Sequence, residues 1–174
     1  MHRDPLANPG PLIRRVYSYV AYRIGDGPDA EDVTSEVFER ALRYRASYDE
    51  SRGQPLPWLL GIARRCVDDA RAARVTVPLA EPVETASTDV GGDVVQRLVL
   101  AAAIDGLDER GRDLLALRYG ADLTARQIGE VLGLKTNAVE VALHRTLTRL
   151  RGDLDETGEA ARRSAGNPAP GTTP

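Results

Sequence analysis

The chain has 174 residues, of which 42% are hydrophobic and 28% charged, so we expect one domain or two small ones. The net charge of −3 excludes a uniformly basic coat for nucleic acid and leaves only a local basic face. The single cysteine, Cys66, excludes an internal disulfide and a cysteine-rich zinc site, and its apolar helical surroundings predict a buried thiol. No apolar run has membrane-spanning length and no signal peptide opens the chain, so we expect a cytoplasmic protein.

The first third of the chain predicts two helices after a loose N-terminus at residues 1–10. Apolar residues at helical spacing place the first helix over 11–24: Ile13, Val16, Tyr17, Val20 and Ile24. The second opens at Asp29, with acidic residues in its first turn where the helix dipole favours them. Its expected inner stripe is Ala30, Val33, Val37, Ala41 and Tyr44, with Phe38 and Leu42 beside it. Its outer side carries several carboxylates, which by themselves indicate an ordinary solvated face.

A third helix, expected over 58–74, follows a loop at 48–57 that is marked by Gly and Pro. Its expected buried side is Leu59, Ile62, Ala63, Cys66 and Ala70. Trp58 and Arg65 are seven residues apart and therefore share a different side, with Arg64 and Arg71 nearby. This side has two interpretations: a platform that stacks single-stranded bases, or a tryptophan that closes the edge of the core.

Residues 76–93 contain four acidic residues, two prolines and a pair of glycines without helical periodicity, which predicts an acidic linker. Helices are expected next over 94–105 and 109–119, with Asp108 as a candidate cap for the latter. Residues 154–174 are expected to form a disordered tail.

The segment 123–150 predicts two helices joined by a tight turn. Thr124 and Gln127 have the spacing of a capping box, and Gly133 suits the left-handed turn. The apolar side of the second helix is Val139, Leu143, Leu147 and Leu150. The pattern is typical of a helix-turn-helix, whose second helix reads the DNA major groove, although helical bundles contain similar hairpins.

Four motifs in this order resemble the extracytoplasmic-function (ECF) group of bacterial RNA polymerase sigma factors. They are DAEDVTSEVFERAL (29–42), WLLGIARRCVDDARAAR (58–74), LDERGRDLLALRYGADLTARQIGEVLGL (107–134) and LHRTLTRLR (143–151). The resemblance implies an all-α fold of two small helical domains joined by a flexible acidic linker. These would be a region 2-like domain at 11–75, the linker at 76–93, and a region 4-like helix-turn-helix domain at 94–153.

The resemblance also implies a function and partners. A sigma factor binds core RNA polymerase, through the beta-prime clamp helices and the beta flap, and directs promoter-specific initiation. The residues that correspond to the clamp contact are Asp29, Asp32, Glu36, Phe38 and Glu39. An anti-sigma factor is a further candidate partner, although no residue identifies one. No membrane partner is expected.

Promoter contacts follow from the same resemblance. The −10 element would meet Tyr48, Trp58, Arg64, Arg65, Arg71 and Arg74. The −35 element would meet Thr124, Arg126, Lys135, Thr136, Asn137, Glu140, Val141, His144, Arg145 and Arg149. The chain departs from the family pattern at Ser35, at 55–57 (Pro-Leu-Pro), at Arg65, and at 140–142, where Glu-Val-Ala replaces a frequent Lys-Ser-Arg. The last change removes two cations from the DNA face.

Two other classes of function compete with this interpretation. A helix-turn-helix regulator could bind DNA without joining polymerase, but the first domain shows no ligand-binding constellation that such a regulator would use. An enzyme is not expected, because the sequence has no phosphate-binding glycine loop and no metal-ligand cluster. No cofactor is expected.

Overall fold

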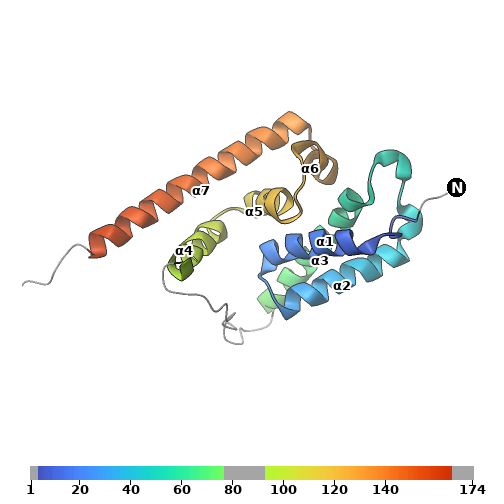
Figure 1. The fold of residues 1–174 in the computed structure, drawn as a ribbon, viewed down its shortest axis with the longest axis horizontal. Coiled ribbons are helices and arrows are strands. Elements are labelled where there is room, and N and C mark those ends of the chain that lie inside the picture. The colour runs from blue at the N-terminus through green and yellow to red at the C-terminus, as the bar shows by residue number, and fades with distance from the viewer. Residues whose placement is uncertain (1–3, 77–92, 166–174) are drawn as a thin grey trace, which may run out of the picture.

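The computed structural model describes residues 4–76 and 93–165, and every regular element among them is helical. The α-helices are α1 (Pro9–Ile24), α2 (Pro28–Arg43), α3 (Pro55–Thr76), α4 (Asp93–Asp105), α5 (Glu109–Leu115), α6 (Ala125–Leu132) and α7 (Thr136–Ala165). Two 3₁₀ turns, η1 (Arg45–Ser47) and η2 (Glu50–Arg52), precede α3, and a π-helical turn, η3 (Ala116–Gly120), continues α5. The all-α prediction is confirmed. We call α1–α3 the first domain and α4–α7 the second domain (Figure 1).

The buried side of α1 agrees with most of the predicted stripe: Val16 and Val20 are fully buried, and Tyr17 and Ile24 are partly buried against the core. Ile13 was expected inside but is 43% exposed, whereas Tyr19, which the prediction omitted, is fully buried. The helix packs through Leu12, Val16, Tyr19 and Val20, which have the same three- and four-residue spacing as the predicted set. Periodicity therefore identified the helix and most of its inner face, and the prediction was wrong only for Ile13.

The ends of α2 and α3 also differ from the predictions, for reasons of backbone geometry. Tyr44 was expected on the inner stripe of α2 but caps the end of that helix and is 54% exposed. Helix α3 starts at Pro55, three residues before the predicted Trp58. Proline suits this position because it lacks a backbone N–H, and the N–H groups of the first helical turn have no partner within the helix. Cys66 is buried, as predicted, and burial raises the pKa of its thiol.

The helix-turn-helix has the local geometry that the sequence predicts. The Thr124 hydroxyl accepts a hydrogen bond from the backbone N–H of Gln127, and the Gln127 side chain accepts one from the N–H of Thr124, which completes the capping box. Gly133 adopts the left-handed conformation at φ 68°. Val139 is fully buried, so the predicted inner side of α7 is confirmed at this residue.

The C-terminal helix is longer than predicted. Helix α7 continues as a single helix to Ala165, so the expected tail is wrong for residues 154–165. The sequence there is rich in Glu, Ala and Arg, which are good helix formers. The rest of the expected tail, residues 166–174, and nearly all of the predicted linker, residues 77–92, lie outside the described residues.

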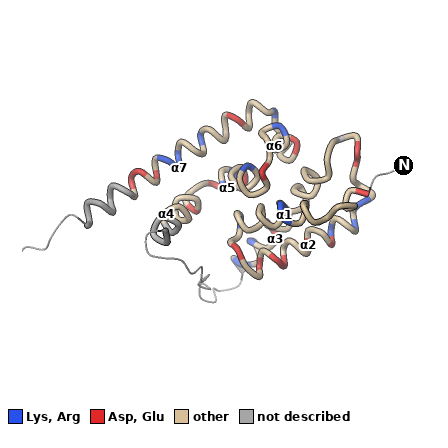
Figure 2. Tube along the Cα trace, viewed as in Figure 1, with Lys and Arg blue, Asp and Glu red and all other residues tan. Residues whose placement is uncertain are grey.

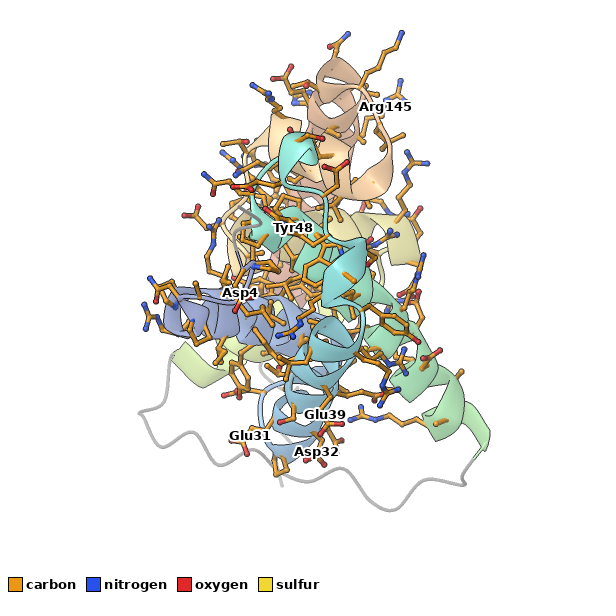
Figure 3. All side chains as sticks on the ribbon, turned by 90° about the vertical axis from the view of Figure 1, so that its right-hand side faces the viewer. Asp4, Glu31, Asp32, Glu39, Tyr48 and Arg145 are labelled. Atoms are coloured by element: carbon orange, nitrogen blue, oxygen red, sulfur yellow. The ribbon has the colours of Figure 1, made fainter. Side chains whose placement is uncertain are left out.

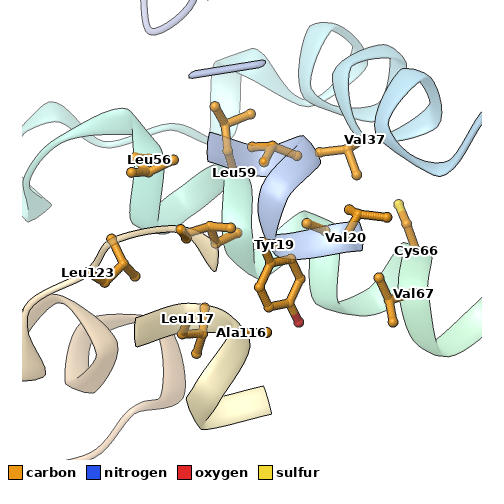
Figure 4. Packing of buried hydrophobic residues seen from close by; sticks show 14 of the residues in the cluster. Tyr19, Val20, Val37, Leu56, Leu59, Cys66, Val67, Ala116, Leu117 and Leu123 are labelled. Atoms are coloured by element: carbon orange, nitrogen blue, oxygen red, sulfur yellow. The ribbon is translucent and has the colours of Figure 1, made fainter. Parts of the chain in front are cut away.

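The two domains share one hydrophobic core, a feature that the sequence did not predict. Tyr19 and Leu59 of the first domain belong to the same buried cluster as Leu114, Leu117 and Leu123 of the second. Figure 4 shows Ala116, Leu117 and Leu123 in the same cluster as Tyr19 and Leu56. The domains are therefore packed against each other through α1, α3, α6 and η3.

The close approach of η3 to α1 depends on a glycine. A Cβ atom on Gly120 would lie 2.9 Å from the carbonyl oxygen of Ser18 and 3.1 Å from the ring of Tyr22. Beside this contact, Arg15 donates to the carbonyl oxygens of Ala121 and Asp122, at 2.7 and 2.6 Å. The backbone of the second domain thus rests directly on α1.

Candidate nucleic-acid interface

The outer side of α7 forms the first part of the candidate interface. Asn137, Glu140, Val141, His144 and Arg145 are exposed on this helix. Basic positions recur along the first half of α7 (Figure 2). A cavity of about 640 Å³ between α5 and α7 is lined by Lys135, Asn137, Val141 and Arg145 together with Arg110.

Arg110 joins this surface although sequence reasoning missed it. It lies in the first turn of α5 and is exposed. The sequence indicated Arg110 only weakly, as one cation in the helix that precedes the helix-turn-helix. The crossing of α5 and α7 brings it to the same cavity as Arg145, 35 positions later in the chain.

Three of the predicted −35 residues lie elsewhere or have another contact. Thr124 uses its hydroxyl in the capping box, so its first role is to start α6. Arg126 is on exposed α6 surface and forms an ion pair with Glu130 at 3.4 Å. Arg149 donates to the carbonyl oxygen of Gly106 at 3.2 Å and so reaches toward the end of α4. Thr136 is the exposed first residue of α7.

A second cavity, of about 520 Å³, lies between the η1–η2 loop and the start of α3, and it brings together Tyr48, Trp58 and Arg65. The two aromatic rings have centroids 5.5 Å apart. The Tyr48 hydroxyl donates to the carbonyl oxygen of Gly53 at 2.7 Å, which fixes the loop. Trp58 is also partly buried against the core, which supports the interpretation of a tryptophan that closes the core edge. A role in stacking single-stranded bases stays a prediction.

The other three predicted −10 arginines are held in ion pairs away from this cavity. Arg64 donates through Nε to Asp113 at 2.7 Å, and Arg71 donates to Glu109. Both carboxylates belong to α5, in the second domain. Arg74 instead pairs with Asp29 at the start of α2. The structure therefore separates Arg64, Arg71 and Arg74 from Arg65, which is exposed.

Sequence reasoning missed the group of buried polar residues that receives these arginines. Asp113 is 6% exposed and accepts a hydrogen bond from the Tyr19 hydroxyl at 2.6 Å. Arg23, with a side chain 2% exposed, pairs with Glu109 and lies 3.9 Å from Asp113. Burial, followed by the charge of Asp113, raises the pKa of Tyr19 well above its ordinary value. The sequence signal was Asp113, a carboxylate directly before the apolar run 114–117. This pattern does not indicate which residues pair with it.

The acidic side of α2 is a third exposed surface. Asp32 and Glu39 are exposed there, at the opposite end of the view in Figure 3 from Arg145. Glu36 is paired with Arg40, whose guanidinium also donates to Asp69 at 2.9 Å, and both bonds raise the pKa of Arg40. Phe38 is partly buried against the core. Among the predicted clamp contacts, Asp32 and Glu39 are thus the most available carboxylates.

Comparison with known families assigns both halves of this architecture. Residues 11–75 match the family Sigma-70 region 2, and residues 103–152 match Sigma-70, region 4. The ECF RNA polymerase sigma factor SigK of Mycobacterium ulcerans is 30% identical over 150 residues, which span 81% of this chain and 80% of that protein. The chain belongs to the ECF RNA polymerase sigma factors. The match at 11–75 favours this family over a helix-turn-helix regulator that acts without polymerase.

Further relatives agree with the family. The ECF sigma factor BldN of Streptomyces coelicolor is 30% identical over 149 residues, 79% of this chain and 56% of BldN. Among solved structures, CnrH in complex with the cytosolic domain of CnrY has a TM-score of 0.58, with 24% identity over 87% of this chain and 85% of that one. The sigma factor RpoE of Bartonella quintana, in complex with the anti-sigma factor NepR, also has a TM-score of 0.58, with 15% identity over 83% and 92%. These likenesses support the fold of this sigma factor.

Two other kinds of site are absent from the described residues. None of the helices in residues 4–76 and 93–165 combines the length and apolar character needed to cross a membrane. Within the same residues, no group of three or more His, Cys, Asp or Glu side chains is placed to hold a metal ion.

Proposed function

We propose that this chain directs promoter-specific initiation by core RNA polymerase, as a non-enzymatic subunit that acts in the cytoplasm. The observation that carries the proposal is the order of the two matched regions, region 2 before region 4, on one chain. The geometry supports it: an aromatic cavity with Arg65 lies on the first matched region, and an exposed reading helix lies on the second. Each would contact one promoter element.

The placement of the side chains supports a role for each of the following residues. Tyr48, Trp58 and Arg65 would receive the opened −10 strand, since aromatic rings stack on bases and arginines hold phosphates. Val141 and Glu140 would select bases of the −35 element, through a thymine methyl group and a cytosine amine. Arg145, Lys135 and Arg110 would hold phosphates beside them.

Two protein partners complete the proposal. Asp32 and Glu39 of α2 would meet the polymerase clamp helices, and the second domain would meet the beta flap. An anti-sigma protein is the second partner. Its support is that RpoE was solved with the anti-sigma factor NepR bound, and CnrH with the cytosolic domain of CnrY bound. Co-purification of the tagged chain from its own cells, followed by mass spectrometry, would test for both partners.

Run-off transcription tests the function directly. Core polymerase is incubated with a library of randomised promoters, with and without this chain, and the transcripts are sequenced. We expect transcripts that start at a fixed distance from a recurring pair of motifs, in the reactions with the chain alone. Equal transcript pools with and without the chain would refute the proposal. A Val139→Asp variant, which disrupts the buried side of α7, serves as the inactive control.

A further inference from the structure

A cavity of about 600 Å³ lies where the end of α1 meets α3, α4 and α5, in the closed arrangement with the two domains packed together. Arginines from three helices line it: Arg23 of α1, Arg71 and Arg74 of α3, and Arg112 of α5. This cavity is separate from the aromatic cavity at Trp58 and from the exposed side of α7. The proposed promoter contacts leave it without a role.

The arginines of this cavity carry more hydrogen-bond donors than the chain supplies acceptors. The carboxylate of Glu109 is the shared partner of Arg23, Arg71 and Arg112. A carboxylate accepts about four hydrogen bonds, which is fewer than the N–H donors of a single guanidinium. Two buried nitrogens of Arg23 and the buried Nε of Arg112 have no hydrogen-bond partner within the described part of the chain. Buried donors in this state favour a further anionic acceptor.

The chemistry of the arginines selects the kind of anion. The side chain of Arg23 is 2% exposed, and it approaches Asp68 and Asp113 only to 3.9 Å, beyond hydrogen-bond distance. A buried cation depends strongly on its counter-charges. The planar fork of a guanidinium binds a phosphate through two parallel hydrogen bonds. Because the guanidiniums come from different helices, they suit a ligand with several linked phosphates.

The remaining wall of the cavity is apolar and carries an aromatic ring. Its residues are Ala21, Ile24, Ala101 and Ile104, together with Tyr22, which is 50% exposed. An exposed tyrosine ring offers a face on which a planar base stacks. The volume lies within the range of about 300–1,000 Å³ that is typical of small-molecule sites. A flat ring joined to a chain of phosphates would match both walls.

We propose that this cavity binds a nucleoside polyphosphate, with the phosphates on the arginines and the base against Tyr22. Asp105, at the end of α4, is the acidic residue of the lining, and its charge opposes the ligand. The affinity is therefore set by the balance between the arginines and this carboxylate. Since the ligand touches both domains, its binding stabilises the packed chain.

Titration calorimetry of the full-length chain with ATP, at physiological ionic strength and without Mg²⁺, tests the site. Arg112→Gln should weaken ATP binding about tenfold, since it removes a charge-assisted contact to phosphate. Tyr22→Leu should weaken it several-fold, because the stacking face is lost. Asp105→Asn should tighten it several-fold, and an unfolded protein could not produce such a gain.

Each variant has a matched control outside the cavity. Arg151→Gln and Asp155→Asn make the same changes of charge at exposed positions of α7. Tyr119→Leu removes a ring that is 52% exposed and does not line the cavity. All three controls should bind ATP with the affinity of the wild type. Absence of saturable ATP binding, or equal changes in the variants and their controls, would overturn the site.

Tripolyphosphate and adenosine separate the two parts of the ligand. The wild type should bind ATP more tightly than either of them, and Tyr22→Leu should lose affinity for ATP while its affinity for tripolyphosphate stays unchanged. Equal affinities of the wild type for ATP and tripolyphosphate would overturn the nucleotide assignment. Circular dichroism checks the fold of each variant. If Arg112→Gln fails to fold, Asp105→Asn decides, and unchanged binding by that variant would then contradict the proposal.

Discussion

The two candidate DNA surfaces differ in what their cations already bind. On the second domain, Lys135 and Arg145 are exposed beside Val141 on the outer side of α7. On the first domain, Arg64 and Arg71 are paired with carboxylates of α5 in the second domain. The candidate surface on α7 is exposed, whereas these two arginines of the candidate surface on α3 are covered by α5.

This difference shows that one fold can give its two recognition surfaces unequal accessibility without any partner. A sequence-reading helix needs exposure along one side, and α7 obtains it by burying Val139 and Leu143 on the other. The strand-opening surface has the same type of side chains, but it lies where the second domain packs. Under the proposed function, DNA contact at Arg64 and Arg71 would compete with the contact between the domains.

The strongest test of this contrast is the coupling of the domains in unfolding. Leu117 of the second domain is fully buried in the shared core, so Leu117→Ala should lower the free energy of unfolding by about 2–5 kcal/mol. Trp58, the single tryptophan of the chain, reports on the first domain. We expect its fluorescence transition in urea to shift with the transition seen by circular dichroism.

The control for that experiment is Leu100→Ala, because Leu100 is 41% exposed and should change little. If Leu117→Ala moved the circular-dichroism transition and left the Trp58 transition in place, the domains would unfold independently. The covered state of the first surface would then lack the energetic basis described here.

The open surface should separate specificity from affinity. Glu140→Ala should change the preferred base at one −35 position, with a loss of about 1–3 kcal/mol for that base. Arg145→Ala should weaken all sequences alike and reduce the salt slope of binding by about one. Selection from a randomised −35 pool with the polymerase holoenzyme measures both. A shifted preference for Arg145→Ala, or an unchanged one for Glu140→Ala, would contradict the assignment.

The covered surface should be sensitive to alkaline pH. Tyr19 has a raised pKa, so the folded chain holds its proton more tightly than the unfolded chain does. The contribution of Tyr19 to the free energy of unfolding is fully present below the ordinary tyrosine pKa of about 10. It falls as pH rises above that value, by about 1.4 kcal/mol per pH unit. The charged groups that face Tyr19 are Arg23 on α1, Arg64 on α3 and Asp113 on α5. Urea unfolding between pH 9 and pH 11.5 measures the loss.

Tyr19→Phe is the matched variant for the pH experiment. It removes the titrating hydroxyl and keeps the ring in the core, so the loss of stability above pH 10 should be smaller than in the wild type. An identical pH dependence in the two proteins would show that other groups dominate the alkaline transition.

The smallest effect should come from the third surface, on α2. Asp32→Lys with Glu39→Lys should slow the association with core polymerase several-fold at low salt, since charges at a rim act mainly on the on-rate. Reversal of the exposed pair Asp155 and Glu156 is the control with the same change in net charge. Stopped-flow experiments at two ionic strengths measure the association rate with core polymerase. Equal rates for both double variants would remove α2 from the docking surface.

The sequence predicted best those features that depend on neighbouring residues. The capping box at Thr124, the left-handed turn at Gly133 and the buried side of α7 all depend on spacings of a few residues, and the structure has all three. The stripe of α1 shows the limit of such patterns. Leu12 and Ile13 are both apolar, so spacing alone did not decide which of them faces the core.

The sequence could not predict contacts between distant parts of the chain. Tyr19 and Asp113 are 94 positions apart, and nothing in the local pattern of either helix identifies the other. The family resemblance assigned Arg64 to promoter DNA, and that role stays a prediction. Its partner in the folded chain, Asp113, lies 49 positions away in the sequence and meets Arg64 only through tertiary packing.

Gly120 has a consequence for how such a chain diverges. Its backbone does not require a glycine, and the need for one arises from Ser18 in the other domain. A larger residue at this position would be silent in a second domain studied alone and disruptive in the whole chain. Among homologues that keep the closed arrangement, position 120 and the carboxylate at 113 should be inherited together. Lineages that lose one are expected to lose the other.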